Sequence, residues 1–203
     1  MATSWGDGER SRFESVRLQR RVLVVVDNVV AMTRLLDVVD LFEGDFRVAL
    51  DFVWNTDDPQ SNGLAELFAA KGVFPVKAGL SREYELAITA GHSGLLDVRP
   101  PILSLPHGIR YTKIVPEARK PGSPEAFGLS PELLLADGRP IPSAIVLTHD
   151  EQLARLRASA PQAAEVAVVT GDPCYDRLRA SIPWRLRYRL ALGPVSEVDL
   201  GLR

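Results

Sequence analysis

One short segment of the chain combines residue types that could act on a substrate. It runs SLPHGIRYTK over residues 104–113 and places His107 between a proline and a glycine. A histidine titrates near neutral pH and can take a proton from a hydroxyl group. Arg110 and Lys113 could contact phosphate oxygens, and Gly108 would let a ligand approach the backbone closely. Two interpretations stay open: an active-site loop, or a strand-end turn in which His107 binds local carbonyl groups.

A second segment, TGDPCYDRL over residues 170–178, reads as a strand, a turn and the start of a helix. Free backbone N–H groups at a helix start suit a phosphate, which makes Gly171 and Asp172 candidates for substrate binding. Asp172 is also a natural N-cap, with Pro173 at the first helical position. Its carboxylate would then occupy those donors and repel an anion. A structural cap is therefore the favoured interpretation.

The sequence lacks the motifs of several enzyme classes, which disfavours them. No glycine-rich dinucleotide fingerprint and no phosphate-binding Walker motif occurs, so no cofactor is predicted. The segment AGHSGLL holds His92 and Ser93 but lacks the nucleophile elbow of a hydrolase. His149 falls in the first turn of a predicted helix, where a surface role is favoured. Cys174 is the one cysteine, so a disulfide within the chain and a cysteine-based zinc site are both excluded, and no metal is predicted.

Bulk composition indicates an ordinary globular protein. The chain has 203 residues, of which 46% are hydrophobic and 25% are charged, enough for one large domain with a core. The net charge of −2 gives no sign of nucleic-acid binding. The N-terminal residues lack the apolar core of a signal peptide, and the run at 22–26 is too short to span a bilayer. These features predict a soluble, cytoplasmic protein.

Apolar runs alternate with helical periodicity along most of the chain. Strands are predicted at 20–29, 46–55, 73–79 (the weakest), 84–91, 101–108, 143–147 and 165–170. Helices are predicted at 31–42, 64–72 with a glycine stop, 149–159, and after Asp172. Thr148 and Glu151 have the spacing of a capping box. Residues 114–142 are predicted to be irregular because they are rich in proline and glycine.

This alternation predicts a doubly wound, mostly parallel, Rossmann-like α/β domain over residues 20–190. A polar arm (1–19) would precede it and a tail (191–203) would follow. Ligands of such sheets gather beyond the carboxyl ends of the strands. His92, His107, His149 and Gly171 all follow predicted strands and are expected along one rim. The segment WRLRYRL (184–190) could touch an anionic lipid surface or nucleic acid, but an amphipathic helix that closes the domain is favoured.

The two chemistry-bearing segments together resemble the paired signatures of the CDP-glycerol glycerophosphotransferases. These are polymerases of the teichoic-acid type with a two-domain GT-B architecture, and the likeness is nearest to their actinobacterial relatives. Their first signature, W-H-G-T-x-x-K, is matched by His107, Gly108 and Lys113, and their second, G-x-P-R-x-D, by Gly171, Pro173 and Asp176. The chain departs from the pattern at Pro106, Ile109 and Cys174, which replace tryptophan, threonine and arginine, and in a lysine spacing one residue longer.

The resemblance implies that this chain is the acceptor-side domain of a glycosyltransferase or glycerophosphotransferase of envelope polymer synthesis. His107 would be the general base, and backbone groups near Gly108 and the side chain of Lys113 would steady the developing charge. The donor would be CDP-glycerol or a nucleotide sugar, bound mainly by a second domain, and the acceptor an envelope polymer or a lipid-linked chain at the inner face of the membrane. The sequence ends about where that domain is expected to begin, so little or no turnover is expected from this chain alone.

Two alternatives to this transferase function stay open. One is a non-catalytic binding or assembly domain that needs a separate second half. The other is a small α/β hydrolase or sugar-nucleotide enzyme that uses His92, Ser93 or His149.

Overall fold

A computed structural model describes residues 18–54, 63–76, 83–91, 98–106 and 129–187. The chain divides into two compact units, residues 1–170 and 171–203, and each is described by itself. The first unit contains the large sheet with its covering helices. The second contains the helices that follow the last strand.

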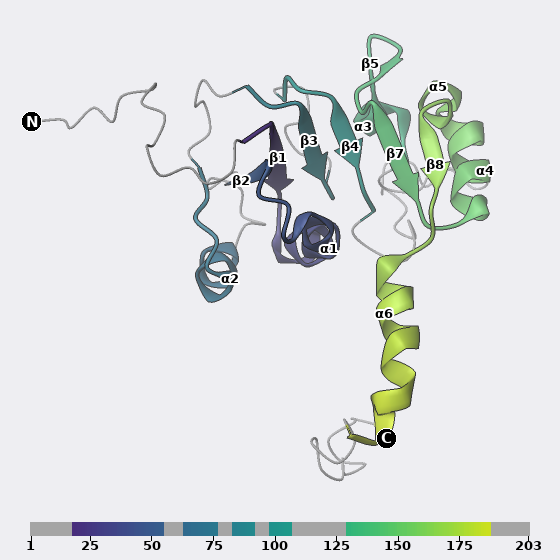
Figure 1. Ribbon diagram of the computed structural model, residues 1–203. Helices are drawn as coiled ribbons and strands as arrows, with labels where there is room; N and C mark the ends of the chain where they lie inside the picture. The colour runs from purple at the N-terminus through teal and green to yellow at the C-terminus, as the bar shows by residue number, and fades with distance from the viewer. Residues whose placement is uncertain (1–17, 55–62, 77–82, 92–97, 107–128, 188–203) are drawn as a thin grey trace, which may run out of the picture. The chain divides into compact units, whose positions relative to one another are not determined.

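Six parallel strands form the sheet of the first unit, in the spatial order β2-β1-β3-β4-β7-β8 (Figure 1). The strands are β1 (Arg20–Val26), β2 (Val48–Trp54), β3 (Leu86–Thr89), β4 (Ile102–Ser104), β7 (Ala144–Leu147) and β8 (Ala167–Val169). The predicted Rossmann-like α/β fold with a mostly parallel sheet is confirmed. Parallel strands need long crossover connections, and the helical segments between the apolar runs provide them.

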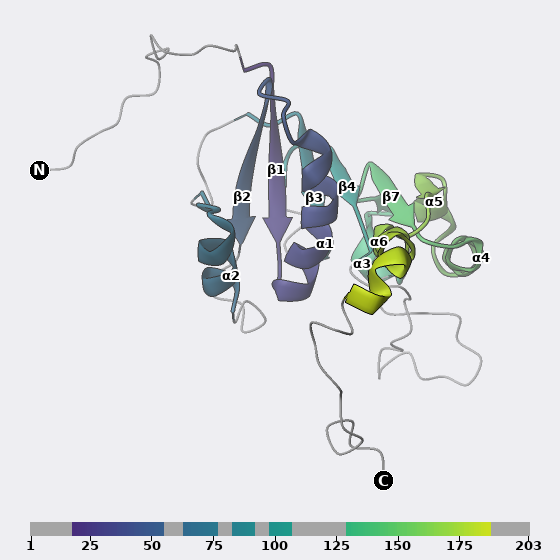
Figure 2. The ribbon, with the colours of Figure 1, turned by 60° about the horizontal axis from the view of Figure 1, so that its bottom comes forward.

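Helices cover opposite faces of the sheet at its two ends. The helices α1 (Val29–Val39) and α2 (Leu64–Lys71) pack on the face that carries Val22, Val24 and Val26. At the other end, α4 (Asp150–Ser159) and α5 (Pro161–Ala164) pack on the face that carries Ile145 and Leu147. Figures 1 and 2 show α1 beside β1, α2 beside β2, and α4 and α5 beside β7 and β8. Each end of the sheet is thus covered on one face, and the residues of β1 that point to the other face, Leu23 and Val25, are half-buried.

The first strand is shorter than predicted and the first helix starts earlier. The strand ends at Val26 rather than at residue 29, and α1 begins at Val29 rather than at residue 31. The reason is Asn28, whose side-chain Oδ1 accepts a hydrogen bond of 2.9 Å from the N–H of Ala31. This cap turns the backbone into a helix although the apolar run continues. A short 3₁₀ turn, η1 (Asp40–Phe42), completes the predicted helix, and Gly72 ends α2 in the left-handed conformation, as predicted.

The predicted strand at 73–79 is wrong for its described part, residues 73–76, which form no strand. Residues 77–79 lie outside the described part of the chain. Pro75 has no N–H to donate to a neighbouring strand, which explains why these residues form no strand. One hydrogen bond of 2.7 Å, from Val76 N–H to Phe52 O, nevertheless joins this segment to β2. The segment therefore lies beside β2 without extending the sheet.

The predicted irregular stretch 114–142 contains regular structure where it is described, from residue 129 onward. The helix α3 (Pro131–Leu134) is followed by a hairpin of β5 (Leu135–Ala136) and β6 (Arg139–Pro140). Asp137 and Gly138 connect the two strands, and both have positive φ angles, of 50° and 74°. An Asp-Gly pair is typical of such two-residue hairpin turns. The composition of the stretch concealed this local signal.

The predicted capping box at the start of α4 is displaced by one residue. His149, not Thr148, is the N-cap, and its Nδ1 accepts a hydrogen bond of 3.1 Å from the N–H of Glu151. A second bond is made by Gln152, whose Oε1 accepts from the N–H of Thr148, the residue before the N-cap, at 2.8 Å. Gln152 is buried, so a glutamine rather than a glutamate makes this bond where the charge would be costly.

The second unit is described for residues 171–187. Its helix α6 (Pro173–Ser181) begins after Asp172, which is the N-cap as predicted, and continues into the 3₁₀ turn η5 (Ile182–Trp184). Of the predicted amphipathic segment 184–190, residues 188–190 lie outside the described part. Trp184 is 54% exposed and lies 6.0 Å from the guanidinium carbon of Arg187. Among the described residues, no helix has both the length and the apolar character needed to cross a membrane.

Candidate functional site

The strand order reverses between β1 and β3. From β1 the chain passes to β2 on one side of the sheet, and it later returns to β3 on the other. In open parallel sheets, ligands bind beyond the carboxyl ends of the strands at such a reversal. Asp27 and Asn28 follow β1 there, and Ala90 and Gly91 follow β3. This edge of the first unit is therefore the place where a ligand site is expected.

Two buried hydroxyl groups end neighbouring strands at the same level of the sheet. Thr89, the last residue of β3, pairs in register with Ser104, the last residue of β4. The residues are 0% and 1% exposed, among strands that are otherwise aliphatic. Backbones of adjacent strands are about 4.8 Å apart, so the two side chains lie on one face as neighbours. A polar spot thus interrupts the apolar sheet at its carboxyl end.

Thr89 has a defined structural role at this edge. Its Oγ1 accepts a hydrogen bond of 3.1 Å from the N–H of Gly91, which fixes the turn after β3. Ser104 lies beside it at the end of β4 and is 1% exposed.

Gly91 lies directly against the side chain of Asp27. A Cβ atom on Gly91 would overlap the carboxylate of Asp27, both its Oδ2 and its Cγ. The φ angle of Gly91 is outside the left-handed region, so a glycine is required there by space and not by backbone conformation. We call Asp27, Thr89, Gly91 and Ser104 the switch-point cluster. They bring a carboxylate and two hydroxyl groups to one stretch of the sheet edge.

The first turn of α1 is poorly suited to an anion. The N–H of Ala31 is occupied by Asn28 Oδ1 at 2.9 Å, and the negative charge of Asp27 precedes it. A helix N-terminus attracts anions only where its donors are available and no carboxylate competes. No group of three or more potential metal ligands occurs among the described residues.

The first predicted motif lies outside the described residues. His107, Gly108, Arg110 and Lys113 all fall in the range 107–128, so their assignment stays a prediction. The described chain ends just before them at Pro106, two residues after the end of β4. His92 and Ser93 are likewise outside the described residues and follow Gly91.

Among the described candidates of the other motifs, Asp172 and His149 are helix N-caps. Asp172 Oδ1 accepts a hydrogen bond of 2.9 Å from the N–H of Cys174, in agreement with the favoured interpretation of a structural cap. Gly171, with φ of 94°, has a conformation that other residues rarely adopt. His149 is exposed and caps α4. No substrate contact is assigned to these residues by their geometry, and their predicted roles in binding stay untested.

Sequence reasoning missed Asp27, Thr89 and Ser104. A signal for each was present, because LAIT and ILS are aliphatic runs that end in a hydroxyl residue, and Asp27 directly follows VLVVV. The pairing of Thr89 with Ser104 requires the strand register, which no local pattern supplies.

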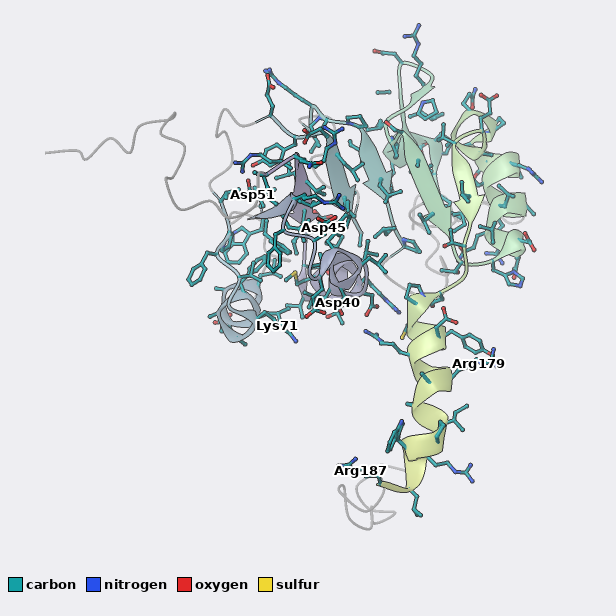
Figure 3. The ribbon with its side chains drawn as sticks, viewed as in Figure 1. Asp40, Asp45, Asp51, Lys71, Arg179 and Arg187 are labelled. Carbon is teal, nitrogen blue, oxygen red and sulfur yellow. The ribbon has the colours of Figure 1, made fainter. Side chains whose placement is uncertain are left out.

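A second polar group lies on the sheet away from this edge and has a structural role. Asp51 of β2 is labelled in Figure 3. It accepts a hydrogen bond of 3.1 Å from the hydroxyl of Tyr84 and lies 3.7 Å from Arg21 Nη1. The backbone N–H of Arg21 donates to Glu85 Oε2 at 2.7 Å, and this bond lowers the pKa of the Glu85 carboxyl. These contacts tie residues 84–85 to β1 and β2.

Comparisons of the chain with models of known families, with curated proteins and with solved structures found no match. The resemblance to the glycerophosphotransferases therefore stays a hypothesis.

Proposed function

We propose that the chain is the acceptor-side domain of a transferase of envelope polymer synthesis. The observation that supports this most is the switch-point cluster, a polar spot at the carboxyl edge of a parallel sheet where the strand order reverses. Strand β4, which supplies Ser104 to the cluster, leads within three residues to His107 of the first motif. The segment that carries the proposed chemistry thus follows directly, in the sequence, a strand that ends in the switch-point cluster.

In the proposed reaction, His107 accepts the proton of an acceptor hydroxyl group. The hydroxyl oxygen then attacks the phosphorus of CDP-glycerol that carries the glycerol, or the sugar carbon of a nucleotide sugar that is bonded to the phosphate. The bond from that atom to the leaving oxygen of the nucleotide breaks, and the nucleotide leaves with the bonding electrons. Gly108, Arg110 and Lys113 would stabilise the charge that develops in the transition state.

The test is the loss of transfer in His107→Ala. The chain is assayed together with a separately produced C-terminal domain of the same architecture, with CDP-glycerol as donor and a glycerol phosphate oligomer as acceptor. Removal of a general base typically lowers the rate by about 10²- to 10⁴-fold. His149→Ala is the matched control, because His149 caps α4 at an exposed position and should leave transfer unchanged. Equal transfer by His107→Ala and the unmodified chain would remove the base assignment.

One observation favours a second candidate function, a non-catalytic assembly domain. The helix α6 and the first residue of η5 expose Tyr175, Leu178 and Ile182 to 58%, 63% and 56%. Their spacing of three and four residues puts them on one side of a helix. Exposed apolar stripes of this kind often mark a contact with another protein. Light scattering of the unmodified chain and of Leu178→Glu tests it, since an assembly domain would be oligomeric and the variant a monomer.

A further inference from the structure

We infer that the helical segment 173–187 of the second unit binds the surface of an anionic lipid bilayer. One apolar side would lie in the membrane interface, with the arginines among the headgroups. The segment consists of α6, η5 and the three helical residues that follow them. The inference goes beyond the proposed transferase function, because it uses none of the residues assigned to catalysis or to substrate binding.

The segment is one continuous helix that buries none of its side chains. Ile182 and Arg185, which follow α6 and η5 respectively, have right-handed helical backbone angles, with φ of −54° at both. No residue of α6 or η5 is buried. A helix of this length is only marginally stable in water unless a partner covers one of its sides. The segment is therefore expected to dock on a partner.

An apolar stripe runs along one side of the segment. Tyr175, Leu178, Ile182 and Leu186 follow one another at spacings of three, four and four residues, which places them on one side of a helix. Their exposed fractions are 58%, 63%, 56% and 66%. An interfacial helix buries such a stripe at the boundary between headgroups and acyl chains. A tyrosine suits this boundary because its ring is apolar and its hydroxyl is polar.

Arginines border this stripe and make the segment positive. Residues 173–187 contain four arginines and one aspartate, a formal charge of +3, whereas the whole chain has −2. Arg179 lies one helical turn from Tyr175 and from Ile182, and Arg185 lies one turn after Ile182. Both arginines are exposed. The stem of an arginine can lie along an apolar surface while its guanidinium reaches a headgroup phosphate.

The charge also distinguishes a bilayer from two other partners. Two copies of the segment would each bring a charge of +3 to their contact, and like charges at an interface repel. A nucleic acid would bind the arginines through its phosphates but would leave the apolar stripe in water. An anionic bilayer accommodates the stripe and the arginines together.

The test is sedimentation of the full chain with lipid vesicles. We expect binding to vesicles with about 30% phosphatidylglycerol and none to phosphatidylcholine alone, and weaker binding as NaCl is raised. Arg179→Gln/Arg185→Gln should weaken binding about 25-fold, because each basic residue near an anionic surface contributes about 5-fold. The matched control is Arg155→Gln/Arg157→Gln on α4. It removes the same charge at two exposed positions and should bind like the unmodified chain.

Leu178→Ser tests the apolar contact independently. It should weaken binding to the anionic vesicles roughly 10-fold, because it removes a leucine side chain from the interface. Leu41→Ser is its control, since Leu41 is 80% exposed in η1 of the first unit, and it should bind like the unmodified chain. Circular dichroism checks that the variants fold. Each replaces an exposed side chain, so the thermal midpoints should equal that of the unmodified chain.

Four outcomes overturn the inference. They are no binding of the unmodified chain to the anionic vesicles, equal weakening by a control variant and its counterpart on the segment, and unchanged binding by Leu178→Ser. The fourth is a dimer in light scattering that Leu178→Ser dissociates, which would make the stripe a contact between copies, as in the second candidate function. None of these outcomes affects the His107→Ala assay, which uses a water-soluble acceptor.

Discussion

Asn28 determines where the first strand ends and the first helix begins. Its Oδ1 accepts a 2.9 Å hydrogen bond from the N–H of Ala31 and so satisfies one of the free amides of α1. We expect Asn28→Ala to lower the free energy of unfolding by about 1 kcal/mol, as is usual for loss of an N-cap. Urea denaturation measures the change. Asn28→Asp, which keeps a cap acceptor, is the control, and equal midpoints for Asn28→Ala and the unmodified chain would deny Asn28 this role.

Asp45 forms an ion pair with Arg47, and this pair lowers the pKa of the Asp45 carboxyl group. Both of its oxygens accept hydrogen bonds of 2.8 Å from the Arg47 guanidinium. The side-chain bond from Arg47 is the main reason that the pKa of Asp45 falls to about 2, and the N–H of Arg47 adds to it. Because the folded-state pKa lies below the ordinary value, the pair stabilises the fold above that value. Its contribution is lost as the pH falls toward about 2.

NMR titration of the Asp45 carboxyl measures this effect directly. We expect a midpoint near 2 in the unmodified chain. In Arg47→Gln the midpoint should return toward the ordinary range of an aspartate, near 4. The same ordinary midpoint in both proteins would show that the pair is not formed in solution.

Among the elements, α2 is attached to the sheet by two buried side chains, Leu64 and Phe68, of which Phe68 is the larger. Phe68 is 2% exposed and packs with its ring centroid 4.6 Å from that of Trp54 and 6.1 Å from that of Phe52. We expect Phe68→Ala to reduce the free energy of unfolding by about 3 to 5 kcal/mol, since it removes a buried aromatic and leaves a cavity. Chemical denaturation followed by circular dichroism measures the loss.

Phe74 is the matched control for Phe68. It lies six residues further along the chain and is 90% exposed. Phe74→Ala should therefore change the free energy of unfolding by less than about 0.5 kcal/mol. Similar losses from the two substitutions would mean that α2 does not pack on β2 as described.

Whether a segment forms a helix or a strand was predictable from the sequence where its hydrophobic pattern was long. The start or end of a helix was predictable where the sequence held an explicit capping residue. The apolar runs give six of the seven predicted strands, and Gly72 and Asp172 end or begin helices as expected. Errors arose where a polar residue acts inside an apolar context, as Asn28 does within the first run. The switch-point cluster was not predictable, because the pairing of Thr89 with Ser104 is a property of strands distant in sequence.

For the first unit, the order of the strands links stability to the site. β1 and β3 lie inside the sheet, with hydrogen-bonded neighbours on both sides, and they are the two strands between which the order reverses. The carboxylate of Asp27 and the turn of Gly91 are thus supported by the most fully paired strands. A site supported in this way can be held rigidly without contributions from the sheet edges.

The same order predicts how amide exchange is distributed over the sheet. β1 pairs with β2 along Arg20–Val26 and with β3 along Val22–Val25. Within the described part of the chain, β8 pairs with β7 alone, and its Val168 is 56% exposed. Amides in β1 should therefore exchange only through global unfolding, and those of β8 through local opening. We expect hydrogen exchange of β8 to be faster by about two orders of magnitude. Exchange of β8 as slow as that of β1 would mean that another element covers this edge in solution. Mass spectrometry of peptic fragments resolves the two strands.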